Sequence, residues 1–193
     1  MKHLTLLSFL GLLLIGACTK SKSSSPAPSV TPSPYYFNFS LGSAVHNLNA
    51  NSPYYMNIGT DGLGGFEVGD LKAQLPAIGL GFTWVHKDTV HESDLMSLAG
   101  RTIYFDDTAI NIFLEYDSTT SLYSGWFAMD TSNHSYYVKV NSVTYQKNDT
   151  AYGIPVRVYA INGTCSAVMR QQTDTTTLTN GEFNLVVAGS VAK

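Results

Sequence analysis

The chain has 193 residues, of which 44% are hydrophobic and 13% are charged, and this composition excludes a disordered polymer, a collagen-like repeat and a coiled coil. Eleven basic and fourteen acidic residues give a formal net charge of −3. Because neutralising phosphates requires clustered Lys and Arg, we expect no nucleic-acid partner. The composition fits one ordinary folded domain.

The beginning of the chain predicts an export signal. A short basic start precedes an apolar run at residues 4–17, which is shorter than the roughly 20 residues of a membrane-spanning helix. The run ends in Ile-Gly-Ala followed by Cys18, which resembles the lipobox of bacterial lipoproteins. The resemblance implies a signal peptide over residues 1–17 and acylation of Cys18 by chains such as palmitate, which would anchor the mature protein to a membrane.

The segment after the anchor predicts a tether. Residues 19–34 contain four prolines, six serines and a single Val, so they cannot bury enough apolar surface to order themselves. With Cys18 they form the expected tether, residues 18–34. Aspartate does not follow Cys18, and the acidic export tag of surface lipoproteins from Bacteroidota is missing. Lipoprotein sorting rules therefore imply the outer membrane, with a periplasmic orientation favoured over surface display.

Residues 35–193 form the expected folded domain. Three of the eleven basic residues and none of the fourteen acidic ones precede it, so its formal charge is −6. Its dominant pattern is the two-residue alternation of half-buried antiparallel strands, as in Ile110, Ile112, Leu114 and Tyr116. About nine strands are predicted, at residues 35–41, 43–48, 77–86, 101–105, 110–116, 122–129, 136–141, 156–160 and 182–187.

Only residues 93–100 are predicted to be helical, with Ser93 as the N-cap and Gly100 at the C-terminal stop. Many short strands with almost no helix predict an all-β fold, either an antiparallel β-sandwich or a small β-barrel. We favour the sandwich, because the expected loop at residues 49–70 interrupts the regular strands that a barrel needs.

Two Asn-Gly steps, at residues 162–163 and 180–181, predict a turn or a bulge at each position. In this region the sequence resembles uncharacterised lipoproteins of Bacteroidota that share a C-terminal Thr-Asn-Gly-x-Phe signature, here at residues 179–183. The resemblance covers mainly residues 94–187. It implies a β-sandwich and carries no assigned chemistry.

The densest titratable cluster contains His86, Asp88 and His91, whose side chains are suitable ligands for Zn²⁺. Their spacing fits no familiar zinc site, so the favoured interpretation is a solvated turn without metal. Cys165 has no neighbouring base and is expected to pack as a small hydrophobic residue. We therefore expect no catalytic residues and no cofactor.

Aromatic residues are plentiful, with twelve Tyr, nine Phe and two Trp. Rings on an exposed sheet can stack on sugars, although aromatic pairs also stabilise sheets without any ligand. The candidates for glycan binding are Trp84, Trp126, Tyr54 and Tyr55.

A tripeptide of Asp, then Ser or Thr, then an apolar residue or Thr occurs five times. It resembles the O-glycosylation acceptor of periplasmic Bacteroidota proteins, although Asp-Thr and Asp-Ser also initiate turns. The resemblance implies that glycan is carried by one or more of Thr89, Thr108, Ser118, Thr150 and Thr175.

Together these features predict a non-enzymatic, lipid-anchored protein of the cell envelope that serves in binding or structural support. Its partners would be the membrane, through the lipid, and a protein or glycan of unknown identity. The alternatives are a carbohydrate-binding accessory lipoprotein and a metal-dependent hydrolase.

Overall fold

Ten strands and one short helix make up the described part of the computed structural model, which covers residues 35–50, 65–68, 76–85, 87, 91–118, 125–151 and 154–189. These residues belong to one compact unit, Pro32–Lys193. Every strand pairing is antiparallel. The all-β prediction is confirmed, since a single short helix accompanies the strands in the described residues.

Six strands pair in the order β2-β1-β10-β9-β8-β5 and form the first layer. In that order they span Ala44–Ala50, Tyr35–Leu41, Asp174–Gly189, Ile154–Gln171, Tyr137–Ala151 and Thr102–Tyr104. The long hairpin of β9 and β10 lies at its centre.

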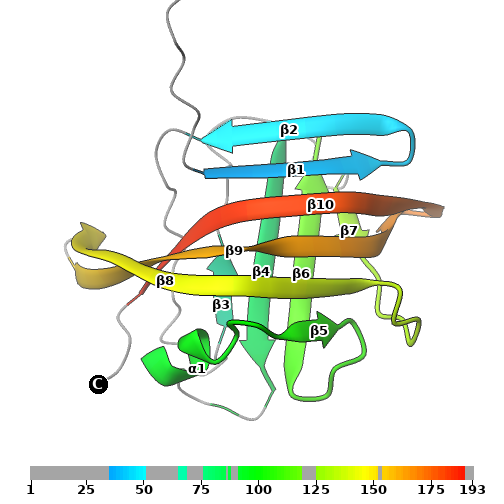
Figure 1. The fold of residues 1–193 in the computed structure, drawn as a ribbon. Coiled ribbons are helices and arrows are strands. Elements are labelled where there is room, and N and C mark those ends of the chain that lie inside the picture. Colours follow the sequence, from blue (N-terminus) through cyan, green and yellow to red (C-terminus); the bar gives the residue numbers. More distant parts are fainter. Residues whose placement is uncertain are drawn as a thin grey trace, which may run out of the picture. The chain divides into compact units, whose positions relative to one another are not determined.

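Four further strands, in the order β7-β6-β4-β3, form the second layer. They span Trp126–Ala128, Ile110–Asp117, Ala77–Trp84 and Gly65–Val68. Strand β9 connects the layers, because it pairs with β8 as far as Ser166 and with β7 at Met169 and Arg170. Figure 1 shows β4 and β6 running across β10, β9 and β8.

The hydrophobic core lies between the two layers. Phe39 of β1 packs edge-on against Tyr116 of β6, with ring centroids 5.1 Å apart, and the Tyr116 hydroxyl hydrogen-bonds His46 Nδ1 of β2 at 3.2 Å. Both layers contribute large, fully buried side chains, among them Tyr159, Phe37, Phe39, Phe82, Phe183, Ile78, Leu80, Ile103 and Ile110, and Leu95 of the helix and Leu98 after it are fully buried as well. Burying each such side chain stabilises the fold by about 1.5–3 kcal/mol.

Strands β2 and β3 are the two ends of the sheet order, and they do not pair with each other. The sheet is therefore not closed, and the sandwich that we favoured describes it better than the barrel. Strand β3 supplies the tenth strand. It lies in the segment 49–70 that the sequence predicted to be a loop, because a four-residue strand is too short to give a clear alternation.

Strands β8, β9 and β10 are longer than predicted. Strand β9 continues straight through Asn162-Gly163, and the irregularity lies instead on β8, between Val140 and Ser142. The second Asn-Gly step forms the predicted bulge: the register of β10 shifts between Leu178 and Gly181, and Asn180 has a φ of 52°.

Helix α1 spans Glu92–Met96, and its N-cap is His91 rather than the predicted Ser93. The Asp94 carboxylate accepts a hydrogen bond from the His91 backbone N–H at 2.9 Å, so an acidic residue in the first turn satisfies the N-terminus in place of Ser93. The helix ends at Met96 with Ser97 as its C-cap, so the C-terminal stop predicted at Gly100 was too late. Gly100 has a φ of 79° and lies in the turn that follows the helix.

Candidate functional site

The outward face of the sheet carries the candidate site. Along β9, alternate residues face the core and are buried, namely Ile161, Gly163, Cys165, Ala167 and Met169. The residues that alternate with them point outward and are Asn162, Thr164, Ser166, Val168 and Arg170. The pairing places Phe127 of β7 opposite Arg170, so the outward face continues from the first layer onto the second.

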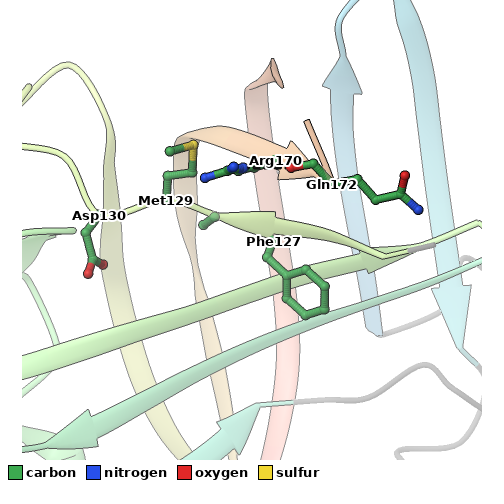
Figure 2. Close-up of a pocket in the computed structure, with 6 residues that line it drawn as sticks. Phe127, Met129, Asp130, Arg170 and Gln172 are labelled. Carbon is green, nitrogen blue, oxygen red and sulfur yellow. Dashed lines mark hydrogen bonds between the residues drawn. The ribbon is translucent and has the colours of Figure 1, made fainter. Parts of the chain in front are cut away.

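A pocket of about 400 Å³, here called the β7 pocket, opens where β9 exchanges β8 for β7. It is lined by Phe127, Ala128, Met129, Asp130, Arg170 and Gln172. Figure 2 shows Phe127 and Asp130 on β7 and the segment after it, and Arg170 and Gln172 on the neighbouring strand and its turn. The pocket thus combines an aromatic ring, a thioether, a carboxylate and a guanidinium.

Two rings are exposed at this pocket and on the strand beside it. Phe127 is 44% exposed and Phe113 of β6 is 41% exposed, with ring centroids 6.4 Å apart and an interplanar angle of 58°. Next to them Gly79 of β4 leaves the sheet without a side chain, and a Cβ there would have only Phe113 Cε1 nearby, at 3.9 Å. Phe113 and Phe127 therefore form an open aromatic platform.

Arg170 is held by the turn that follows its strand. Its Nε donates to the backbone carbonyl of Gln172 at 2.8 Å, and Gln172 has a φ of 52° in the β9–β10 turn. A guanidinium has five N–H donors in a fixed plane, and a carboxylate such as that of Asp130 is an acceptor. This set can hydrogen-bond adjacent hydroxyls of a ligand whose apolar face stacks on a ring.

A second hollow, here called the bulge pocket, lies farther along the same face and has a volume of about 480 Å³. The bulge at Asn180 forms one side, and the side chains that line the pocket are mostly hydroxyls and amides. The lining is Ser135, Tyr137, Thr164, Cys165, Ser166, Thr179, Asn180, Gly181 and Glu182.

Two hydrogen bonds fix the geometry of the bulge pocket. The Ser166 hydroxyl donates to the Leu178 carbonyl at 3.1 Å, and the Tyr36 hydroxyl donates to Glu182 Oε1 at 3.3 Å. Partial burial, with the nearby Glu182 charge, raises the pKa of Tyr36 above its ordinary value. The pocket therefore presents neutral groups apart from Glu182.

The aromatic residues singled out in the sequence lie elsewhere. Trp84 is only 7% exposed and belongs to the core, and Trp126 is half-buried and packs against it. Tyr54 and Tyr55 lie outside the described residues. Phe113 and Phe127 were missed. Phe113 stands between the core residues Ile112 and Leu114, and Phe127 between Trp126 and Ala128, so two-residue alternation turns both rings outward.

Of the three candidate metal ligands, the structure describes only His91. His86 and Asp88 lie outside the described residues, and His91 caps α1 with its side chain exposed. Asp94 forms an ion pair with Lys87. Partial burial acts to raise the pKa of Asp94, but the hydrogen bonds from Lys87 and the His91 backbone outweigh it, so this pKa lies below its ordinary value.

The two cysteines have different outcomes. Cys165 is 2% exposed and free of disulfides, and burial raises its pKa to about 12. The prediction that it packs as a core residue is confirmed, and at neutral pH its thiol is protonated and shielded. Cys18 lies outside the described residues.

The predicted glycosylation sites in the described residues are all exposed: Thr108, Ser118, Thr150 and Thr175. Thr89 lies outside the described residues. The Asp107 carboxylate accepts the backbone N–H groups of Ala109 and Ile110 at 2.8 and 3.0 Å. At this position the Asp-Thr step therefore also shapes a turn.

No protein-family model matches the chain, and no match emerges among curated proteins or solved structures. In the part of the chain that the structure describes, the helix is too short to span a bilayer.

Proposed function

We propose that this protein is a non-enzymatic, carbohydrate-binding lipoprotein of the cell envelope. Acylated Cys18 and the tether of residues 18–34 would hold the domain at the outer membrane, facing the periplasm. The resemblance of the segment before Cys18 to the lipobox of bacterial lipoproteins, and of the Thr-Asn-Gly-x-Phe signature to lipoproteins of Bacteroidota, supports this location.

One observation carries the carbohydrate assignment: an exposed Phe127 ring shares a pocket with Asp130, Arg170 and Gln172. Sugars present an apolar ring face and a periphery of hydroxyls, so they need an aromatic surface beside hydrogen-bonding groups of both kinds. An apolar partner would leave the Arg170 and Asp130 charges without compensation. A simple anion would meet the repulsion of Asp130.

The cysteine beside the bulge pocket is not suited to act as a nucleophile. Cys165 borders the bulge pocket, but burial raises its pKa to about 12 and its side chain points to the core. A protonated, buried thiol does not attack a substrate.

The test uses the full lipidated protein in detergent on an array of neutral polysaccharides and peptidoglycan fragments, followed by calorimetry. We expect binding to at least one neutral glycan and a loss of about tenfold or more in Phe127→Ala. The matched control is Tyr145→Ala, which removes a ring that is 48% exposed on β8 and should leave affinity unchanged. An array without binding, or equal losses in both variants, would overturn the proposal.

A further inference from the structure

We infer that the β7 pocket and the bulge pocket are two ends of one extended site, which binds an oligosaccharide rather than a single sugar. This inference rests on the proposed function and specifies its ligand. Both pockets lie on the same face of the same strand: Thr164 and Ser166 line one and Arg170 lines the other.

The separation of the pockets follows from strand geometry. Ser166 and Arg170 are four residues apart on β9, and a strand rises about 3.3 Å per residue, so their side chains emerge about 13 Å apart. This distance exceeds one sugar ring and lies within the reach of a short chain of them. A single sugar can therefore occupy one pocket, and only an oligomer can occupy both.

The outward surface between the two pockets, here called the ligand strip, is suited to a neutral ligand. Val168 is the one outward residue of β9 between Ser166 and Arg170. Beside it on β10 stand Thr177, paired with Val168, and Thr179, which lines the bulge pocket. These side chains offer methyl groups and hydroxyls without charge, so a charged polymer would be desolvated there without a counter-charge.

On the side of β9 away from β10, a single connecting segment borders both pockets. The chain between β7 and β8 contributes Asp130 to the β7 pocket and Ser135 to the bulge pocket. At its start, the Met129 backbone N–H donates to the Val168 carbonyl at 2.9 Å, which fixes this segment to the middle of the strip. The ligand strip therefore consists of β9 in the middle, β10 on one side and the segment between β7 and β8 on the other.

The test measures affinity against chain length. Cello-, manno- and chito-oligosaccharides of one to six units are titrated into the full lipidated protein by calorimetry. We expect the bound series to gain affinity up to a length that fills both pockets and then to level off. The double variant Thr164→Val/Thr179→Val should lower affinity for the longest oligomer about tenfold and for the shortest by less than twofold.

The matched control Thr144→Val changes an exposed threonine of β8 away from both pockets and should change neither affinity. Equal affinity for short and long oligomers, or no effect of the double variant, would overturn the extended site while leaving the proposed function intact. The proposed function itself fails if no oligosaccharide binds at any length, and the inference then fails with it.

Discussion

Phe183 lies directly opposite Gly163 in the β9–β10 pair, and its ring occupies the space where another residue would carry a side chain. A Cβ on Gly163 would lie 2.6 Å from Phe183 Cζ and 2.1 Å from the Lys139 carbonyl oxygen. We expect Gly163→Ala to lower the free energy of unfolding by about 2–3 kcal/mol, because a backbone atom cannot move aside without breaking the β8–β9 pairing. Urea denaturation measures this change.

The control for that substitution is Gly79→Ala. Its Cβ would meet only Phe113 Cε1, at 3.9 Å, so we expect a change within about 1 kcal/mol. A similar loss in both variants would contradict the close packing at Gly163.

The N-terminus of α1 gives a pH-dependent prediction. Asp94→Ala should lower the free energy of unfolding by about 1 kcal/mol at pH 7, since the cap on His91 and the ion pair with Lys87 are lost. Because the folded pKa of Asp94 is lowered, this stabilisation is present above its ordinary pKa and disappears as the pH falls through the folded value. Thermal unfolding of both proteins is measured at pH 7, where the carboxylate is ionised, and at about pH 2 to 3, which is about a unit or more below an ordinary carboxyl pKa. The difference in melting temperature between wild type and variant should be smaller at the acid pH.

Ser93→Ala is the matched control for Asp94, because Ser93 is exposed and is the residue that the sequence favoured as N-cap. We expect it to be neutral. A larger loss in Ser93→Ala than in Asp94→Ala would show that the helix begins where the sequence predicted.

Tyr159 makes the domain sensitive to alkali. Burial, with a smaller contribution from Glu92, raises its pKa from 10.0 to about 12. Between these values the unfolded chain binds fewer protons than the folded one, so stability should fall as the pH rises from about 10 to 12. The urea midpoint should fall over this interval, and less steeply in Tyr159→Phe. An equally steep fall in the variant would assign the effect to other groups.

The thiols report both on the core and on lipidation. In the native protein Cys165 is buried with a pKa of about 12, so a thiol reagent at pH 8 should label nothing. After denaturation we expect one reactive thiol per chain, because acylation would block Cys18. Two thiols after denaturation would contradict acylation, and labelling of the native protein would contradict the buried position of Cys165.

Glycosylation should be visible in the intact mass of the protein from its own host. We expect a mass above that of peptide plus lipid, which decreases in a stepwise manner when Thr108, Ser118, Thr150 and Thr175 are changed to Ala. Thr175 pairs with Arg170, so a glycan on Thr175 would lie beside the β7 pocket. A mass equal to peptide plus lipid would end this hypothesis.

The alternation of apolar and polar residues, together with turn residues at the strand ends, was sufficient to predict nine of the strands. It was not sufficient where burial is incomplete. Strand β3 is too short, and β8 extends to Ala151 through residues that are mostly exposed, where no apolar set marks the strand. The helix boundary was wrong because a backbone hydrogen bond to Asp94 replaced the expected Ser93 cap.

The candidate site was harder to predict than the fold. Tryptophan was favoured for sugar stacking because of its large ring, but that size also makes it a good core residue, and Trp84 is used in this way. Phe127 is exposed because its neighbours Trp126 and Ala128 pack against the core. The pairing of Phe127 with Arg170 depends on β9 exchanging β8 for β7, and a partner exchange of this kind has no local sequence signal.

Because β9 pairs with strands of both layers, its register determines which residues face the core in both of them. A slip of one residue would turn Ile161 and Cys165 outward and bring Thr164 and Arg170 into the core. The bulge at Asn180 and the pairing of Gly163 with Phe183 oppose such a slip, since each fits a single alignment of β9 with β10. The contacts that fix the register of the core therefore also fix which side chains face outward. A chain that misaligns this hairpin loses its core and its ligand strip together.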